Sequence, residues 1–355
     1  MNGAEEGNRG ADRMRVAAAS TVGDAGFERS QALIDAGVDA LMHAADFRGL
    51  YRPFKGLFQH GDALVFGPET RGLPDDVLAS CPPARRVRTG VIGCGSVSNC
   101  YLPVMTQCRY AEVVSVCDIK PERARRQAER FKVPHHYPHI DAMLAGEPFE
   151  FLSDITNMQE HEGINRRALE AGKHVWSEKP IANTLAAGQE LLRTARAKDL
   201  RLWGAPITVQ SPQFAFMAKQ LAAGKLGRLA AAHADYGHEG PDWSAFFYEK
   251  GGGSMPDLAV YNFTSLTGLL GPAKHVAAMV SIVTPERTVG DKGRIQVTEE
   301  DNAMVLLDHG GGVISHVQSG FNYFNPHGHD GGEETRHTIS IVGSRGLRMN
   351  PKTTV

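Results

Sequence analysis

The stretch from Val87 to Asp118 constrains the fold more than any other part of the sequence. Thr89–Ile92 is a short apolar, β-favouring run that leads directly into the glycine-rich turn GCGSVS, and a segment that can continue as a helix follows. A second apolar run, Glu112–Cys117, ends in an acid, Asp118. A glycine-rich turn alone is weak evidence, but the order of strand, tight turn, helix, strand and terminal acid is typical of a dinucleotide-binding unit.

Each part of the turn has a physical role. Gly93 lets the backbone turn sharply, and Gly95 leaves no Cβ in the path of an approaching pyrophosphate. The free N–H groups at the helix start, next to Ser96 and Val97, form a partly positive anion site. Ser98 stands where a third glycine is usual, and its small side chain keeps helix and strand close. We therefore expect Gly93, Gly95, Ser96 and Val97 to bind a dinucleotide.

The acid after the second strand bears on which dinucleotide is bound. Asp118 can accept a hydrogen bond from the 2′-hydroxyl of NAD and would repel the 2′-phosphate of NADP. Ile119 follows in the same segment, and we expect it to contact the cofactor as well. Lys120 and Arg123 are close enough in sequence to weaken the preference. The sequence therefore favours NAD and leaves NADP open.

The composition excludes several classes of partner. The chain has 355 residues, of which 42% are hydrophobic and 22% charged, and its formal net charge is −2. These values indicate a globular protein with room for two domains. The near-neutral balance gives no electrostatic case for nucleic acid or an anionic membrane, so a small-molecule partner is expected.

The cysteines and the apolar runs indicate the compartment. Five cysteines are an odd number, they show no CxxC spacing, and they are expected to be reduced thiols. Met1–Arg15 is polar and lacks the apolar core of a signal peptide, and no apolar run is long enough to span a bilayer. We expect a soluble, cytoplasmic protein.

The first 85 residues do not continue this pattern. Arg15–Ala19, Phe27–Ala36 and Val38–Leu41 form one strand–helix–strand unit in a stretch that resembles part of the inosine-monophosphate dehydrogenase barrel. The later stretch GDALVFGPETRGLPDDVL resembles one motif of the trefoil-knot tRNA ribose methyltransferases. A barrel needs eight such units and a knot needs a second motif, and neither appears. Residues 1–85 are therefore interpreted as an atypical extension, from a fusion or a chimeric gene, that packs poorly.

After Asp118 the sequence alternates between helical and extended segments. Helices are expected at Pro121–Phe131, Asp141–Ala145 and Gly163–Ala171, and strands at Phe149–Ile155 and Lys173–Trp176. Strands that alternate with helices indicate a parallel, doubly wound sheet.

From Pro206 onward the pattern changes to strands in succession. A helix is expected over Phe214–Ala223, and another after the flexible turn Lys250–Ser254. Successive strands indicate a largely antiparallel sheet that is open on one face and suited to pairing with another subunit. The predicted fold class is therefore α/β, a Rossmann doubly wound parallel sheet followed by an α+β domain with a largely antiparallel open sheet. The expected strands are Ala230–Tyr236, Val276–Val283, Asn302–Leu307, Val313–Ser319 and Thr338–Val342.

Three stretches together resemble one family. ITNMQEHEGINRRALEAGKHVWSEKPIANT, preceded by GVIGCGSVSNCYLP and VCDIKPERA, is similar to the Gfo/Idh/MocA oxidoreductases, which join a Rossmann domain to an α/β substrate domain. The resemblance covers about Val87 to Gly346. It implies an NAD(P)-dependent dehydrogenase, with residues 86–206 as the cofactor domain and residues 207–355 as the substrate and oligomerisation domain. The implied reaction transfers hydride between a nicotinamide and a sugar, polyol or related hydroxy compound.

The resemblance also implies roles for single residues. Glu178-Lys179-Pro180 matches the family's signature, and Lys179 inherits the position where nicotinamide and substrate meet, with Glu178 beside the cofactor. An ammonium there can hold the reacting oxygen and stabilise charge during hydride transfer. Thr156, Asn157 and His161 match the segment beside the ribose and nicotinamide, although Asn157 replaces a common proline. His161 is equally well interpreted as a helix-start residue that faces solvent.

GGGSMPDLAVYNFTSLTGLLG resembles the family's substrate helix, whose acid aligns with Asp257. Tyr261 replaces the common histidine, as in the glucose–fructose oxidoreductase and dihydrodiol dehydrogenase branches, where a tyrosine takes the acid–base place. We expect Lys179 to lower the pKa of Tyr261 and allow proton exchange with substrate. The alternatives are a core tyrosine with its hydroxyl at the rim and, for Asp257, a simple helix cap.

Several further expectations complete the sequence-based interpretation. The stretch His238–Phe247 offers polar groups and an aromatic ring for polyol recognition.

No metal is predicted: Asn325–Asp330 and the histidines His135, His136 and His139 are interpreted as surface features. The chain stops soon after Gly343, so the last sheet is expected to be incomplete. The rival hypotheses are a non-catalytic dinucleotide-binding protein, a defective fusion or, on the Phe66–Glu69 stretch alone, RNA ribose methylation.

Overall fold

The computed structural model describes residues 17–20, 40–43, 86–323, 336–345 and 348–349. Two compact units are present, one of residues 1–83 with 211–223 and the other of residues 84–210 with 224–355. The proposed division at residues 86 and 207 stays a prediction.

The first unit contains one strand pair and one helix among its described residues. Strand β1 (Ala17–Ser20) pairs in parallel with β2 (Ala40–His43), as a strand–helix–strand unit requires. The helix expected between them and the methyltransferase-like stretch lie outside the described residues. Helix α8 (Pro212–Ala222) begins two residues before the expected Phe214, because Ser211 Oγ accepts a hydrogen bond from Phe214 N at 3.2 Å and Pro212 occupies the first turn.

The second unit contains the predicted doubly wound sheet. Six strands, all parallel, lie in the order β5-β4-β3-β6-β7-β8. The two short outer strands were not predicted, because three residues are too few for a recognisable pattern. The bounds are β3 Val87–Ile92, β4 Ala111–Cys117, β5 His135–Tyr137, β6 Phe151–Asp154, β7 His174–Ser177 and β8 Leu202–Gly204.

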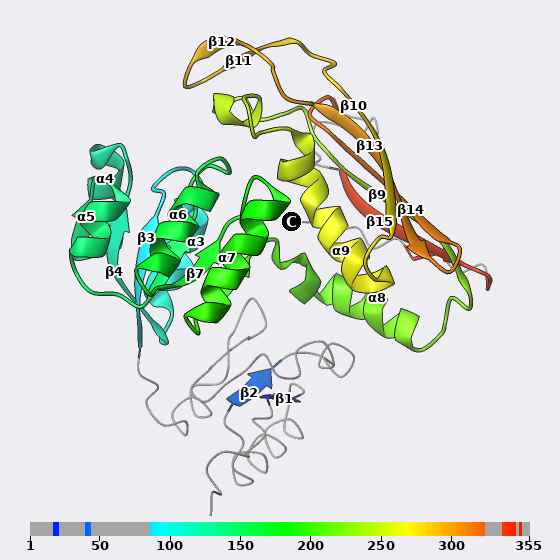
Figure 1. Ribbon diagram of the computed structural model, residues 1–355, viewed down its shortest axis with the longest axis horizontal. Helices are drawn as coiled ribbons and strands as arrows, with labels where there is room; N and C mark the ends of the chain where they lie inside the picture. Colours follow the sequence, from blue (N-terminus) through cyan, green and yellow to red (C-terminus); the bar gives the residue numbers. More distant parts are fainter. Residues whose placement is uncertain (1–16, 21–39, 44–85, 324–335, 346–347, 350–355) are drawn as a thin grey trace, which may run out of the picture. The chain divides into compact units, whose positions relative to one another are not determined.

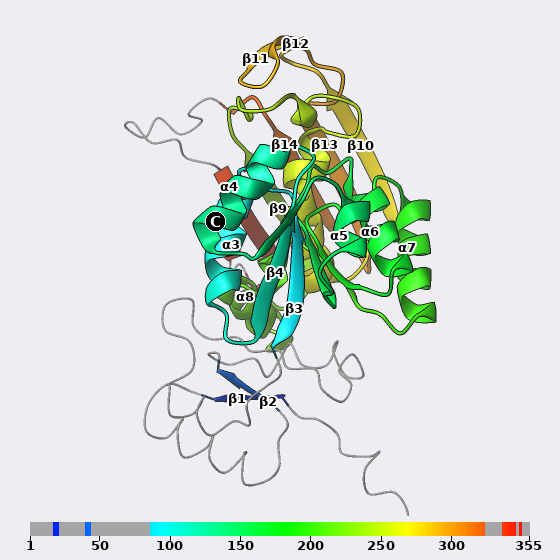
Figure 2. The same cartoon turned by 90° about the vertical axis from the view of Figure 1, so that its left-hand side faces the viewer.

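Helices cover both faces of this sheet, and successive strand residues point to opposite layers. Val91 packs in one apolar cluster with Leu102 of α3 and Ala124 of α4. Its neighbour Ile92 packs in a second cluster with residues of α5, α6 and α7, among them Leu169. Figure 2 shows α3 and α4 on one side of β3 and β4 and the other three helices opposite. The helix bounds are α3 Ser98–Gln107, α4 Pro121–Phe131, α5 Ile140–Ala145, α6 His161–Glu170 and α7 Leu185–Ala197.

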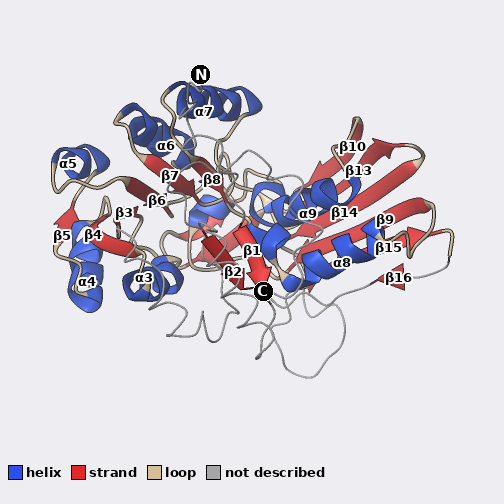
Figure 3. Ribbon diagram, turned by 90° about the horizontal axis from the view of Figure 1, so that it is seen from below, coloured by secondary structure: helices blue, strands red, loops and turns tan. Residues whose placement is uncertain are grey.

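A second six-stranded sheet lies in the order β10-β13-β14-β9-β15-β16. Its pairs are antiparallel except β14 with β9, so the predicted largely antiparallel sheet is confirmed. Helix α9 (Val260–Leu270) contacts β9 and β14 along one face (Figure 3). The bounds are β9 Leu229–Gly237, β10 His275–Ser281, β13 Asn302–Gly310, β14 Val313–Gly320, β15 Arg336–Gly343 and β16 Arg348–Met349.

A separate hairpin extends from the connection between β10 and β13 (Figure 1). It consists of β11 (Glu286–Val289) and β12 (Gly293–Gln296) and was not predicted from the sequence. Its strands carry charged and polar residues at most positions, so no apolar alternation marked them.

The second sheet has one buried and one exposed face. Along β13, Ala303, Val305 and Leu307 are buried, whereas Met304 and Leu306 between them are 48% and 51% exposed. The period of two residues places all the exposed side chains on the face opposite the buried ones. The expected open face is therefore present.

Candidate active site

The glycine turn after β3 has the backbone that the sequence predicted. Gly93 has φ +100°, and a Cβ there would lie 2.6 Å from the carbonyl oxygen of Ile155, so only glycine fits. A Cβ on Gly95 would meet nothing within 4 Å, which leaves open space above the start of α3. Ser98 Oγ donates to the Gly95 carbonyl at 2.6 Å and ties the turn to the helix.

Asp118 supports the same turn from the end of β4. Its Oδ2 accepts a hydrogen bond from Cys94 N and its Oδ1 accepts one from Lys120 N, both at 2.8 Å. A carboxylate has about four acceptor positions, so two bonds leave capacity for ribose hydroxyls. Beside it, Ile119 is 85% exposed and Val97 is 43% exposed, apolar surface that fits the base of a dinucleotide. These residues therefore fit the predicted cofactor.

His161 does not face solvent, so that alternative is wrong. The ring is 1% exposed; its Nδ1 lies 2.7 Å from Pro180 O and its Nε2 lies 3.0 Å from Thr156 O. It therefore joins the loop after β6 to the loop that carries Lys179. Thr156 in turn donates from both N and Oγ1 to Oδ1 of Asp154.

Asp154 is a fully buried carboxyl that no sequence motif indicated. Burial raises its pKa to about 6, although the charge of His161 and the hydrogen bonds from Thr156 oppose the shift. Asn157, the other predicted residue of this loop, has an exposed side chain. The loop after β6 therefore combines a buried polar anchor with an exposed tip.

Lys179 and Asp257 form a buried ion pair across the two halves of the unit. Lys179 Nζ lies 2.5 Å from Asp257 Oδ1 and 2.6 Å from the Asp257 carbonyl oxygen. The two side chains are only 11% and 12% exposed. Asp257 therefore directs its carboxylate to Lys179, and the helix-cap alternative is not observed. The residues predicted as catalytic from separate halves of the chain do meet.

Glu178 is held by a tyrosine that the sequence did not single out. Its Oε1 accepts a hydrogen bond from Tyr101 Oη at 2.5 Å, and Trp176 Nε1 donates to the same phenol oxygen at 3.3 Å. Tyr101 lies on α3, one turn after the glycine turn. The glycine turn and the Glu178-Lys179 segment are therefore connected directly.

Tyr261 joins the pair, but with a different electrostatic effect from the one predicted. Lys179 Nζ lies 5.1 Å from the centroid of the Tyr261 ring, and the ring of Tyr236 packs edge-on against it at 5.3 Å. Burial, followed by the negative charges of Glu178 and Asp257, raises the pKa of Tyr261. The prediction of a lowered pKa is wrong, because Lys179 is paired with a carboxylate and the phenol is buried. At neutral pH the phenol keeps its proton.

A π-helical turn places Asp257 and Tyr261 next to the same ammonium. Residues Met255–Ala259 form this turn directly before α9, and such turns occur often at functional sites. Glu300 fixes its start: Ser254 Oγ donates to Oε2 at 2.6 Å and Met255 N to Oε1 at 2.7 Å. No sequence motif pointed to Glu300, which lies about forty residues downstream.

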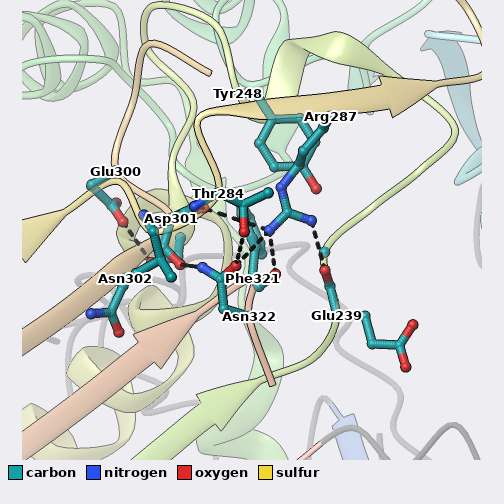
Figure 4. Close-up of polar contacts among 12 residues, drawn as sticks. Glu239, Tyr248, Thr284, Arg287, Glu300, Asp301, Asn302, Phe321 and Asn322 are labelled. Carbon is teal, nitrogen blue, oxygen red and sulfur yellow. Dashed lines mark hydrogen bonds and ion pairs between the residues drawn. The ribbon is translucent and has the colours of Figure 1, made fainter. Parts of the chain in front are cut away.

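The loop beyond β9 is held by Arg287 of the unpredicted hairpin, whose side chain is 12% exposed (Figure 4). Arg287 donates to the carbonyl oxygens of Glu239 at 2.8 Å and of Phe321 at 2.5 Å, and its Nη2 lies 3.5 Å from Oδ2 of Asp301. Its guanidinium stacks over the ring of Tyr248 at 4.9 Å. Asp301 is fully buried. Since Glu239 follows β9 and Phe321 follows β14, Arg287 ties the hairpin to the ends of these two strands.

The stretch His238–Phe247 lies beside this network and contributes aromatic surface. Trp243 is 55% exposed and packs edge-on against Phe247 at 5.4 Å. Gln159, from the loop after β6, donates to the Phe246 carbonyl oxygen at 2.8 Å. The aromatic loop is thus attached to the parallel-sheet half, next to the predicted cofactor residues.

The described residues contain neither a cluster of metal ligands nor a membrane-spanning helix. Among them no three His, Cys, Asp or Glu side chains are grouped as metal ligands, and the tract Asn325–Asp330 lies outside the described residues. Within the same residues, no helix combines the length and apolar character needed to cross a bilayer.

Two family models match the chain. One, described as an oxidoreductase family with an NAD-binding Rossmann fold, matches residues 87–205. The other, the GFO/IDH/MocA C-terminal domain, matches residues 214–347. The resemblances noted for residues 1–85 stay predictions.

Individual relatives are distant. An uncharacterised oxidoreductase of Synechocystis sp. is 27% identical over 225 residues, 61% of this chain and 61% of that protein. Trans-1,2-dihydrobenzene-1,2-diol dehydrogenase of Mus musculus is 27% identical over 236 residues, 64% of this chain and 66% of the enzyme. The dTDP-3,4-didehydro-2,6-dideoxy-alpha-D-glucose 3-reductase of Saccharopolyspora spinosa is 29% identical over 254 residues, 68% and 73% of the respective lengths. The chain thus spans less than two thirds of the first two relatives.

Among solved structures, GenD2 from gentamicin A biosynthesis in complex with NAD has a TM-score of 0.66. It is 22% identical and covers 80% of this chain and 75% of its own, a likeness that shows the fold. Since the two models of one family together extend over both sheets of the second unit, this chain belongs to the Gfo/Idh/MocA family of oxidoreductases with an NAD-binding Rossmann fold.

Proposed function

We propose that this chain is a nicotinamide-dependent dehydrogenase that transfers hydride between the cofactor and a carbon–oxygen group of a sugar, polyol or related hydroxy compound. The observation that carries the proposal is the contact of Lys179 with Asp257 and Tyr261, next to a glycine turn shaped for a pyrophosphate. Family membership supports the reaction class, and the sugar reductase among the relatives supports the substrate class.

The proposed cofactor is NAD, because Asp118 presents a carboxylate where NADP would carry a phosphate. The glycine turn supplies open space at Gly95, and the positive end of the α3 helix dipole lies there without a side-chain cap. When bound, the nicotinamide supplies or accepts the hydride. The proposed cofactor-binding residues are Gly93, Gly95, Ser96, Val97, Asp118, Ile119, Thr156, Asn157, His161, Glu178 and Lys179.

The chain's own residues would handle the substrate oxygen. Lys179 is a buried ammonium held by Asp257, so it can donate a hydrogen bond to that oxygen and stabilise the negative charge that develops on it. Tyr261 keeps its proton because its pKa is raised, so in the reductive direction it is ready to protonate the oxygen. In the oxidative direction the same proton must first leave. The arrangement therefore favours reduction of a carbonyl at neutral pH.

The test is nicotinamide absorbance in both directions against sugars, inositols and the corresponding ketoses, with NADH and NADPH. We expect turnover with NADH, lost in Lys179→Met while NADH still quenches protein fluorescence. Cofactor binding by the wild-type chain without turnover of any compound would contradict the proposal and favour a non-catalytic dinucleotide-binding protein.

We further propose that the open face of the second sheet pairs two copies of the chain. In register across β10 and β13, Met279 lies opposite Met304, and Leu306 and Ile314 continue the apolar surface. These side chains are 82%, 48%, 51% and 51% exposed, and apolar patches of this kind mark interaction sites.

Light scattering after gel filtration tests the pairing. Leu306→Lys should convert a dimer to a monomer, because a charge would be buried between two apolar faces. Leu185→Lys, a matched change at a position 79% exposed on α7, should leave the mass unchanged. A wild-type chain that stays monomeric at high concentration would contradict the pairing.

A further inference from the structure

His238 is the first residue of the stretch that was expected to recognise polyols, and its own contribution can be specified further. His238 follows β9 directly, and side chains two residues apart on an extended chain share a face. Tyr236, two residues earlier, packs against Tyr261 at 5.3 Å between ring centroids. His238 therefore points to the side of the sheet on which Tyr261 and Lys179 lie.

The ring of His238 is held in one orientation. Its Nδ1 accepts a hydrogen bond from Gly240 N at 2.9 Å, so the proton of the neutral ring is on Nε2. Phe321 stacks on the ring, with 5.6 Å between centroids and 28° between planes. No described residue accepts a hydrogen bond from Nε2. The half-buried ring thus presents one fixed, available N–H donor.

Burial keeps the ring of His238 neutral. Burial lowers the pKa of His238; Arg287 and Lys179 lower it further, while Asp257 and Glu239 oppose them. Phe321, which stacks on His238, lies in one buried cluster with Tyr236 and Tyr248, and Tyr261 packs against that cluster. The pKa values of the three phenols are raised, so they keep their protons. At neutral pH the ring is therefore a hydrogen-bond donor without a charge.

We propose that His238 is a specificity-determining residue whose Nε2–H donates a hydrogen bond to a second oxygen of the substrate, on the carbon next to the reacting one. The substrate class would then be vicinal diols and the matching hydroxy ketones, rather than simple alcohols. A donor fixed in a half-buried site discriminates strongly, because a ligand without the acceptor leaves it unpaired. This inference rests on the proposed dehydrogenase function.

The experiment compares matched substrates in matched variants. The probes are trans-1,2-cyclohexanediol with cyclohexanol, and D-glucose with 2-deoxy-D-glucose, each assayed with NAD. The variants are His238→Phe, which keeps the stacking on Phe321 but has no donor, and His238→Gln, whose amide N–H reaches the place of Nε2. NADH binding, followed by fluorescence, reports whether each variant keeps its cofactor site.

We expect the wild type to prefer the vicinal member of each pair by about 5- to 100-fold in kcat/KM. His238→Phe should lose that preference while binding NADH normally, and His238→Gln should keep part of it. If His238→Phe slows both members of a pair equally, or keeps the preference, His238 only packs and the inference is wrong. A wild type that binds NADH and turns over no probe or panel compound would instead refute the proposed function, and this inference with it.

Discussion

The Lys179–Asp257 pair gives the sharpest quantitative prediction. Both side chains are nearly buried and their charged atoms are 2.5 Å apart, so removing one partner leaves an uncompensated charge. Breaking a buried pair in this way costs about 3 to 5 kcal/mol of unfolding free energy. Removing both charges restores most of that loss, since no charge stays buried alone. Stability should therefore fall in each single variant and recover in the double variant.

The assay is a double-mutant cycle in urea with Lys179→Met, Asp257→Asn and both together. We expect a coupling energy of about 2 to 4 kcal/mol, while turnover is lost in all three variants. The exposed pair Arg167–Asp141, 53% and 67% exposed, is the matched control and should couple by less than ~1 kcal/mol. Additive losses at Lys179 and Asp257, within about 0.5 kcal/mol, would refute the reasoning.

Three further predictions follow from single residues. Tyr261→Phe should lower kcat about 10²- to 10⁴-fold without weakening NADH binding, and full turnover in the variant would remove Tyr261 from the mechanism. Because the pKa of the phenol is raised, oxidation by the wild type should accelerate as the pH rises above neutral. Gly93→Ala should abolish folding or cofactor binding, because its Cβ would lie 2.6 Å from a backbone oxygen. Gly95→Ala should fold normally and lose only NADH affinity, since its Cβ would meet nothing within 4 Å. Equal melting temperatures of the two variants would contradict the strain at Gly93. Asp154→Asn should raise the free energy of unfolding by on the order of 2 kcal/mol above pH 6 and leave it nearly unchanged near pH 4. If the free-energy difference between variant and wild type stays constant with pH, the carboxyl titrates normally.

The sign of the Asp154 effect follows from its pKa. Burial raises the pKa of Asp154 from 3.8 to about 6, so between these values the folded chain holds a proton that the unfolded chain has released. Stability therefore falls as the pH rises through this range. The amide carries no charge at any pH, so it avoids this loss.

Local patterns in the sequence were sufficient for most of the fold. The glycine turn, the apolar runs of β3 and β4 and the terminal Asp118 are contiguous, and each fixes its own backbone through short-range sterics and burial. The succession of strands after Pro206 likewise predicted a sheet with one open face. Short or polar elements were not predicted, because β5, β8 and the β11–β12 hairpin contain too few apolar residues for a period to be detected.

The candidate site, too, could be predicted only in part. Lys179, Asp257 and Tyr261 could be named from motifs, each within its own segment. The ionisation of these residues could not be predicted, because the pKa of Tyr261 depends on its burial and on the charges of Glu178 and Asp257, which only folding brings near. His161 was placed on a helix start but its burial was not foreseen.

The sequence by itself determined which residues could bind a dinucleotide and which elements carry them. Only the tertiary structure decided that Lys179 pairs with Asp257, that Glu300 and Arg287 brace the loops around them, and that His238 presents a donor beside them. The reason is physical: backbone propensity and periodicity act over a few residues, whereas charge pairing and desolvation depend on distances between residues far apart in the chain.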